Sequence, residues 1–164
     1  MGHNNQNRST VRQEPEYAVN SEYRESISFT FWGDPKQWRR VNYNAQWKTK
    51  FTPDDMALYQ NNLRAQSLPH KPVMPFVGAI MLECKFYMRI PKSWSKKKKS
   101  VARTDLMPHV KNPDFSNLIK NVEDALTGVY YMDDRQIFCY GDSGKFYSEK
   151  PRVEITVTLI GKEI

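Results

Sequence analysis

Several features of common protein classes are missing from this 164-residue sequence. No apolar run approaches the roughly 18–20 residues of a membrane-spanning helix, and the N-terminus has no apolar core of a signal peptide. The two cysteines, Cys84 and Cys139, lie far apart in the sequence. We interpret both as reduced strand residues of a cytosolic protein, with one disulfide between them as the alternative. The sequence therefore points away from a membrane-spanning or secreted protein.

Three kinds of chemistry also lack their motifs. The two cysteines and three histidines do not have the spacing of zinc ligands, and no glycine-rich phosphate loop is present. Gly141-Asp142-Ser143-Gly144 resembles the nucleophile motif of serine proteases. It falls where a tight turn is expected, and His70 and His109 sit in charged or proline-rich loops. We therefore interpret residues 141–144 as a turn.

What the chain does contain is positive charge and aromatic side chains. Its net charge is +7 and its isoelectric point about 9.4, with 13% aromatic residues. This composition favours a folded core and a polyanionic partner, either nucleic acid or an acidic membrane surface. Residues 1–25 are polar and have no apolar period. We expect a flexible N-terminal tail there and one domain over residues 26–164.

The periodicity of the apolar residues predicts an α+β fold. Strand patterns cover residues 27–31, 76–90 and 152–160, and the second predicts a central strand. Helix signals cover residues 52–66, where Thr52 would be the N-cap and Pro53 the first helical residue, and residues 113–128. Residues 137–140 and 145–147 predict a hairpin around the turn at 141–144. We expect a single α+β domain, a mixed β-sheet with two main helices packed on it.

Two segments combine cations with aromatic rings. The first includes Lys36, Trp38, Arg39, Arg40, Lys48 and Lys50. Cations can neutralise phosphates and rings can stack on unpaired bases, so we expect nucleic-acid contact here; a solvated loop with a few anchoring aromatic side chains is the alternative. The second is the run Lys96, Lys97, Lys98 and Lys99 beside Trp94. It predicts a phosphate-binding loop, and a solvated charge run or a sorting signal is the alternative.

The helix over residues 113–128 has a polar side of unusual make-up. Ser116, Lys120 and Glu123 are spaced i, i+4 and i+7, which places a hydroxyl, an ammonium and a carboxylate along one edge. Two adjacent carboxylates, Asp133 and Asp134, follow in the link to the next strand. So many acids in a basic chain indicate a divalent cation.

The residues in and around this helix resemble a known family. The runs Pro113-Asp114-Phe115-Ser116-Asn117-Leu118-Ile119-Lys120, Glu123-Asp124-Ala125-Leu126-Thr127-Gly128 and Asp133-Asp134-Arg135-Gln136-Ile137 resemble the core of the RusA-type Holliday-junction resolvases. That family's pattern is roughly P-D-x-D-N-L-x-K, D-A-L-x-G and D-D-x-Q-[VI]. Ile90-Pro91-Lys92-Ser93-Trp94-Ser95-Lys96-Lys97 is similar to its P-x-S-x-S-K-K loop, and Lys145 resembles a lysine in its next strand. The resemblance covers about residues 26–160 and is densest over 108–137.

The resemblance implies a small homodimeric endonuclease that nicks branched DNA with Mg²⁺, or Mn²⁺ in its place. Such enzymes are often encoded by phages and prophages and act in the cytoplasm of the bacterial host. By resemblance, Asp114 and Asp134 match two of three metal-binding aspartates, and Lys120 matches the active-site lysine. We expect Glu123 or Asp133 to complete the metal site, and Lys120 to stabilise negative charge in the transition state. A two-fold dimer would place one site on each of two opposed strands.

The third aspartate of the family pattern falls on Ser116, which matters because a hydroxyl is a weaker ligand for Mg²⁺ than a carboxylate. Three interpretations follow. Glu123 could reach back and restore the missing charge, the site could be weakened so that the protein binds junctions without cutting them, or Glu123 could simply cap the helix or pair with Lys120. The competing functional class is therefore a DNA-junction-binding module without cleavage activity.

Overall fold

The computed structural model describes residues 24–39, 42–44, 49–51 and 54–161. Within these ranges the strands are β1 (Glu25–Trp32), β2 (Asn42–Asn44), β3 (Thr49–Phe51), β4 (Ala79–Arg89), β5 (Ile137–Tyr140), β6 (Gly144–Ser148) and β7 (Arg152–Gly161). The helices are α1 (Asp54–Ser67), α2 (Lys96–Ala102) and α3 (Phe115–Leu126), with short 3-10 turns η2 (Leu68–His70) and η3 (Asp134–Gln136). The predicted tail falls mostly on residues 1–23, and the predicted cap residues Thr52 and Pro53 also lie outside the described residues.

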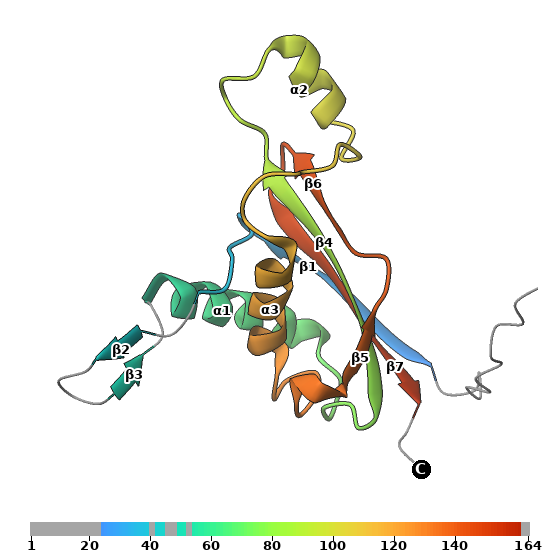
Figure 1. Cartoon of the computed structure of the whole chain (residues 1–164). Coiled ribbons are helices and arrows are strands. Elements are labelled where there is room, and N and C mark those ends of the chain that lie inside the picture. Colours follow the sequence, from blue (N-terminus) through green and yellow to red (C-terminus); the bar gives the residue numbers. More distant parts are fainter. Residues whose placement is uncertain (1–23, 40–41, 45–48, 52–53, 162–164) are drawn as a thin grey trace, which may run out of the picture.

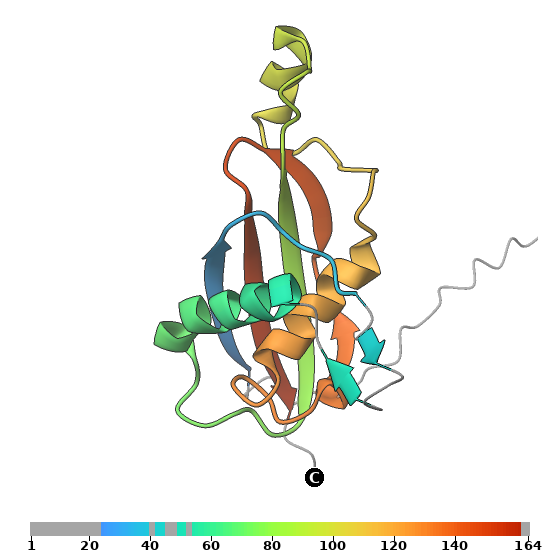
Figure 2. The same ribbon diagram turned by 90° about the vertical axis from the view of Figure 1, so that its left-hand side faces the viewer.

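In the described part of the chain, five strands form one mixed sheet (Figure 1). Its order is β1-β7-β4-β5, and β6 also pairs with β4. β1 and β4 run antiparallel to β7, whereas β5 and β6 run parallel to β4. Helices α1 and α3 lie across one face of this sheet (Figure 2). The structure thus confirms the predicted α+β class, the mixed sheet and the central strand.

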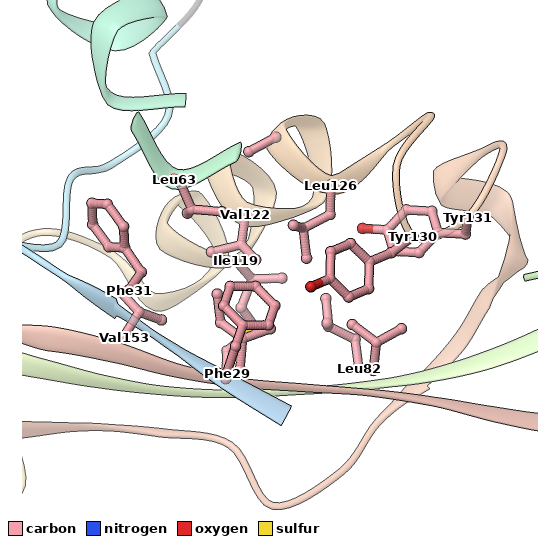
Figure 3. Packing of buried hydrophobic residues seen from close by; sticks show 14 of the residues in the cluster. Phe29, Phe31, Leu63, Leu82, Ile119, Val122, Leu126, Tyr130, Tyr131 and Val153 are labelled. Atoms are coloured by element: carbon pink, nitrogen blue, oxygen red, sulfur yellow. The ribbon is translucent and has the colours of Figure 1, made fainter. Parts of the chain in front are cut away.

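The core fills the space between the two helices and the sheet (Figure 3). Alternate residues of β4 face α3 and are fully buried, as Leu82 and Phe86 illustrate, and the apolar side of α3 packs on them through Leu118 and Val122. Truncating a buried leucine of this kind costs about 2–5 kcal/mol. Tyr130 is also fully buried and donates a hydrogen bond of 2.9 Å to the carbonyl of Ser67, and burial raises its pKa to about 12. The apolar residues found at helical spacing in the sequence are therefore the ones that pack α3 against the sheet.

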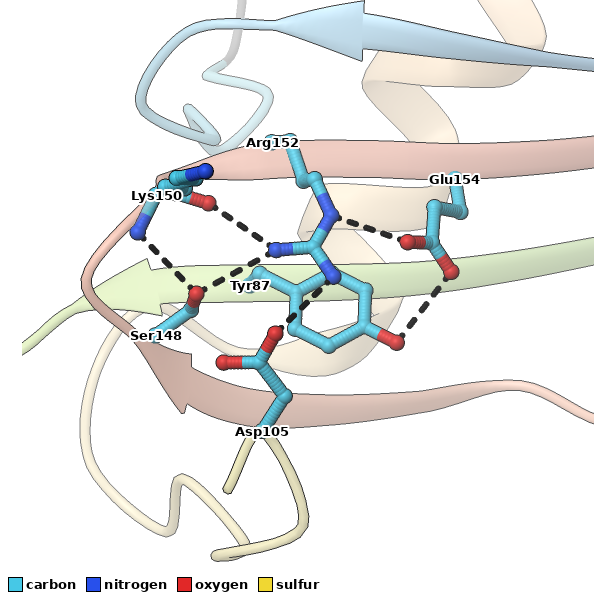
Figure 4. Close-up of polar contacts among 6 residues, drawn as sticks. All are labelled: Tyr87, Asp105, Ser148, Lys150, Arg152 and Glu154. Atoms are coloured by element: carbon cyan, nitrogen blue, oxygen red, sulfur yellow. Dashed lines mark hydrogen bonds and ion pairs between the residues drawn. The ribbon is translucent and has the colours of Figure 1, made fainter. Parts of the chain in front are cut away.

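The face of the sheet opposite the helices is polar, and one arginine on it bonds to residues of the neighbouring loops. Arg152 on β7 donates to Glu154 at 2.8 Å and to Asp105 at 3.0 Å, and its guanidinium lies 3.7 Å from the ring centre of Tyr87 (Figure 4). It also donates to Ser148 Oγ at 3.2 Å. The bond to Asp105 fastens the segment between α2 and α3 to the end of the sheet.

The predicted hairpin at residues 137–147 is wrong. β5 and β6 do not pair with each other but both pair in parallel with β4, one after the other along the same edge, with residues 141–143 between them. Ser143 Oγ accepts a bond of 2.9 Å from the Cys84 amide, and Glu83 accepts one of 2.9 Å from the Asp142 amide. Where the ladder is interrupted, Ser143 thus satisfies an amide of β4 and Glu83 satisfies an amide of the connecting segment. Ser143 therefore has a structural role, as expected for a turn serine rather than a nucleophile.

The lysine run is not the predicted loop but the start of the short helix α2. Ser95 Oγ caps this helix by accepting from the Lys98 amide at 3.4 Å. The ammonium of Lys98 lies 3.7 Å from the ring centre of Trp94, and Lys99 donates to the carbonyl of Lys92 at 2.7 Å. Helix α2 projects past the end of the sheet as an arm (Figures 1 and 2).

Strands β2 and β3 add a small antiparallel pair that the sequence did not predict. Both fall in the basic and aromatic segment of residues 36–51. Arg40 and Lys48 lie outside the described residues, and Lys50 is described only through the backbone of β3. Cys84 on β4 and Cys139 on β5 are free cysteines and lie in strands, as predicted. Among the described residues, no helix combines the length and apolar character needed to cross a membrane.

Candidate functional site

Asp114 stands at the entrance of α3 with its side chain uncommitted to the helix. Its backbone has the extended conformation of an N-cap (φ −66°, ψ 142°), and its carbonyl accepts the first helical bond from the Leu118 amide at 3.1 Å. Its carboxylate makes no capping hydrogen bond, although aspartate is a strong capping residue. The side chain is exposed. Asp114 therefore presents an anionic oxygen ligand at the beginning of the helix.

The loop before Asp114 borders an open hollow of about 720 Å³. Its lining residues are Val110, Lys111, Asn112, Asp114, Phe115 and Lys145. Lys145 Nζ donates to the carbonyl of Lys111 at 2.6 Å and to that of Pro113 at 2.5 Å. Burial lowers the pKa of Lys145, and the negative charge of Asp114 opposes that shift. The hollow thus brings together one carboxylate, one half-buried ammonium and one exposed lysine.

Three residues of the basic and aromatic segment border the other side of the same helix entrance. The Trp38 amide donates to the Asn117 carbonyl at 2.8 Å, and the Asn121 side chain donates to the Lys36 carbonyl at 3.0 Å. Arg39 forms an ion pair with Asp55 on α1. Lys36 and Arg39 line a second hollow of about 370 Å³, together with Asn112 and Pro113. The structure therefore brings Lys36, Trp38 and Arg39 close to the loop that carries Asp114.

Lys120 lies one turn past the exposed Ser116 on the polar side of α3. Its ammonium lies 3.6 Å from Asp124 Oδ1 and 5.6 Å from the ring centre of Trp38. Asp124 was not singled out from the sequence, although its i+4 spacing from Lys120 is the usual signal for such a pair. Lys120 is half-buried and keeps donors for a further anion.

Glu123 does not share the exposed edge that its spacing predicted. It is only 9% exposed, and its Oε1 accepts a hydrogen bond of 2.5 Å from the hydroxyl of Tyr140. Of the interpretations left open for Glu123, the structure does not show the pairing with Lys120, which pairs with Asp124 instead. Sequence reasoning missed Tyr140, because simple alternation from Ile137, which packs against the core, would place Tyr140 on the opposite face, and the β4–β5 register shifts between the two residues. Tyr140 lies opposite Leu82 in the ladder, so it faces α3.

The two adjacent aspartates after α3 have different surroundings. Asp133 caps η3 and is bound by Arg135, whose Nη2 lies 2.8 Å from Asp133 Oδ2. These hydrogen bonds hold the pKa of Asp133 well below its usual range. Asp134 is exposed. Gln136 completes the turn and donates to the carbonyls of Phe76 and Gly78 at 2.9 and 3.1 Å. It therefore anchors the acidic link to the chain before β4.

The predicted acids are not gathered at one point in a single copy. Asp114 is the N-cap of α3, whereas Asp134 begins η3, which follows the other end of that helix, and a helix of 12 residues is about 18 Å long. Within the ranges that the structure describes, no three His, Cys, Asp or Glu side chains form a group that could hold a metal ion. The carboxylates near α3 thus form two separate groups, one at each end.

Comparison with known proteins adds an independent line of evidence. The family described as Endodeoxyribonuclease RusA matches residues 33–158, a range that includes α2, α3 and both aspartate positions. The uncharacterized protein YqaN of Bacillus subtilis (strain 168) is 34% identical over 142 residues, covering 80% of this chain and 94% of YqaN. The similarity extends over most of both proteins.

Proposed function

Because the chain belongs to the RusA endodeoxyribonuclease family, we propose that it is a structure-specific endonuclease that hydrolyses phosphodiester bonds of branched DNA, with Holliday junctions as the substrate. The observation that carries this proposal is the uncommitted carboxylate of Asp114 at the α3 entrance. It stands beside Lys145 and in the same helix as Lys120, at the position where the family pattern has an aspartate. An ordinary surface aspartate would not require two lysines placed near it in this way.

The donor chemistry of Asp114 and Asp134 fits Mg²⁺ or Mn²⁺, because hard cations prefer carboxylate oxygens. In one copy, Asp114 caps the start of α3 and Asp134 follows its end. We therefore propose a homodimer in which Asp114 of one copy and Asp134 of a second copy hold the metal together. Glu123 enters this set only if its bond to Tyr140 opens, and Asp133 only if Arg135 releases it.

When bound, the metal would polarise a phosphoryl oxygen and lower the pKa of a water molecule that attacks phosphorus. The protein's own residues would hold the DNA and stabilise charge. Lys120 would donate to the phosphoryl oxygens as negative charge grows in the transition state. Lys36, Arg39 and the lysines of α2 would neutralise phosphates of the flanking strands.

A second candidate is a junction-binding protein without cleavage activity. Ser116 supports it, because this exposed hydroxyl occupies the position of the third family aspartate. The pairing of Lys120 with Asp124 supports it too, since an ammonium held by a carboxylate is less available to a phosphate. Both candidates predict salt-dependent binding of DNA. Only a cleavage assay separates them.

The test uses a synthetic four-way junction in Mg²⁺ and in Mn²⁺, with a duplex of the same sequence as the control substrate. We expect paired nicks in opposed strands, and loss of nicking with retained binding in Asp114→Asn. Asp54→Asn, which changes an exposed aspartate in the first turn of α1, serves as the matched control. Tight junction binding with no nicking in either metal would establish the binding module. Equal affinity for junction and duplex would contradict both candidates.

A further inference from the structure

Lys145 uses its ammonium on the backbone of the loop that leads to Asp114. It lies on β6 opposite Phe86, and its two bonds to the carbonyls of Lys111 and Pro113 measure 2.6 and 2.5 Å. An ammonium has three donors, so two of the three serve this loop. Hydrogen bonds from a charged donor to carbonyls are among the stronger ones in a protein.

The same loop is fastened to rigid strands at further points. The His109 amide donates to the Lys145 carbonyl at 2.8 Å, and Pro108 forms an isolated bridge with Phe146. Phe115, the first residue of α3, lies edge-on to Phe86 with 5.9 Å between the ring centres. Thus β4 and β6 hold the loop on one side of Asp114 and the helix on the other. Lys145 is the one side chain of this group that binds loop carbonyls just before Asp114, those of Lys111 and Pro113.

Asp114 needs such support because its own side chain does not fix it. Its carboxylate makes no capping bond and is exposed, so only the backbone sets its position. Supporting contacts of this kind set the precision with which a functional side chain is held. What sets Lys145 apart from Lys120 is that two of its three donors are already used by backbone carbonyls of this loop.

We propose that Lys145 is a positioning residue, whose ammonium clamps residues 111–113 to β6 and thereby holds Asp114 at the α3 entrance. This inference rests on the proposed nuclease function for its consequence, but the clamp itself can be measured without cleavage. Lys145 then acts through Asp114 and does not touch the DNA. Lys120 remains the lysine that contacts the reacting phosphate.

The test replaces Lys145 with Met, which keeps most of the length and removes the charge and the donors, and with Gln, which is uncharged and shorter but has two N–H donors. Lys85→Met is the matched control. Lys85 is also a lysine of the sheet, but it lies on the opposite face and pairs with Asp142 at 2.6 Å. We measure hydrogen exchange of the amides of residues 109–116 in the full-length protein. We expect exchange to rise at least tenfold in Lys145→Met, less in Lys145→Gln and not at all in Lys85→Met. Unchanged exchange in a folded Lys145→Met protein would overturn the clamp.

Chemical rescue separates positioning from general destabilisation. Lys145→Cys in a Cys139→Ser background can be aminoethylated to a lysine analogue, while Cys84 is buried and protected. We expect aminoethylation to restore the protection of the loop amides from exchange. The kcat for junction cleavage should fall about 10–100-fold in Lys145→Met and recover in the aminoethylated protein, with KM nearly constant in both. A raised KM with unchanged kcat would overturn the proposal and make Lys145 a DNA contact. If the wild type cleaves no DNA, the proposed function fails while the exchange data still decide the clamp.

Discussion

The hydroxyl of Tyr140 donates a hydrogen bond of 2.5 Å to Oε1 of Glu123, which joins the edge strand β5 to helix α3. The carboxylate is 9% exposed whereas Tyr140 is 52% exposed, so the bond spans the boundary between core and solvent. Burial, followed by the bond to Glu123, raises the pKa of Tyr140. The phenol therefore stays protonated at neutral pH and remains a donor. Glu123 is consequently held toward the sheet rather than toward Ser116.

Tyr140→Phe should destabilise the fold by about 1–3 kcal/mol, because it leaves a buried carboxylate without its donor. Urea unfolding at pH 7 measures this loss. Tyr87→Phe is the control, since the acceptor of its hydroxyl, Glu154 at 3.2 Å, is more exposed than Glu123 and keeps its bond from Arg152, and we expect a smaller effect there. A double variant with Glu123→Gln should lose less than the sum of the two single variants. Additive losses would show that the two side chains are not coupled.

The Asp133–Arg135 pair predicts a pH-dependent contribution to stability. The hydrogen bonds from Arg135 depress the pKa of Asp133 in the folded state. A depressed carboxyl pKa stabilises the fold above the usual aspartate value of about 3.9, and the contribution is lost as the pH falls through the depressed pKa. The Tm difference between wild type and Asp133→Asn should therefore be largest at neutral pH and shrink below about pH 4. Arg135→Gln should show the same dependence, and a pH-independent difference for either variant would refute this origin.

Local sequence patterns were sufficient to predict most of the helices and strands of the main sheet. The prediction of a helix over residues 113–128 was confirmed as α3 at Phe115–Leu126, and that of a strand over 152–160 as β7 at Arg152–Gly161, because burial on one face imposes a period that a sequence displays. The direction taken after residues 141–144 could not be predicted. Gly, Asp and Ser favour a turn conformation, but pairing with β4 decides where the chain goes next. The same limit applies to the site, since the burial of Glu123 depends on Tyr140, which lies 17 positions further along the chain.

Ser143→Ala tests the structural interpretation of the serine at the break between β5 and β6. It removes the acceptor of the Cys84 amide and should cost about 1–3 kcal/mol, with cleavage of junctions unchanged. Ser28→Ala is the control, because Ser28 pairs with Thr156 in an exposed setting where water can replace the lost bond. Equal losses in the two variants would contradict the role assigned to Ser143. Loss of cleavage with full stability would instead indicate that Ser143 takes part in the reaction.

The arm formed by α2 predicts two classes of lysine. Lys98 lies over Trp94 and Lys99 is bound to the Lys92 carbonyl, whereas Lys96 and Lys97 are exposed at the start of the helix. Each phosphate contact adds about 0.9 to the slope of log affinity against log salt on duplex DNA. Lys96→Ala with Lys97→Ala should therefore lower the slope by about 1.8, and Lys98→Ala with Lys99→Ala by less. Binding is measured by salt titration without divalent cations. Equal changes in both pairs would show that the internal contacts do not restrict Lys98 and Lys99.

Mixing two inactive variants tests whether each metal site is shared between copies. Asp114→Asn and Asp134→Asn should each abolish nicking alone, because each removes one carboxylate from every proposed site. In a mixed dimer, one site combines both substituted residues and the other combines the intact Asp114 of one chain with the intact Asp134 of the other. We expect the mixture to recover nicking in one strand of the junction but not paired nicks, since a single site survives. Sites built within one chain would leave every mixed dimer inactive, because no chain then keeps both carboxylates. Co-refolding of differently tagged chains, followed by purification through both tags, ensures that the assay measures the mixed dimer.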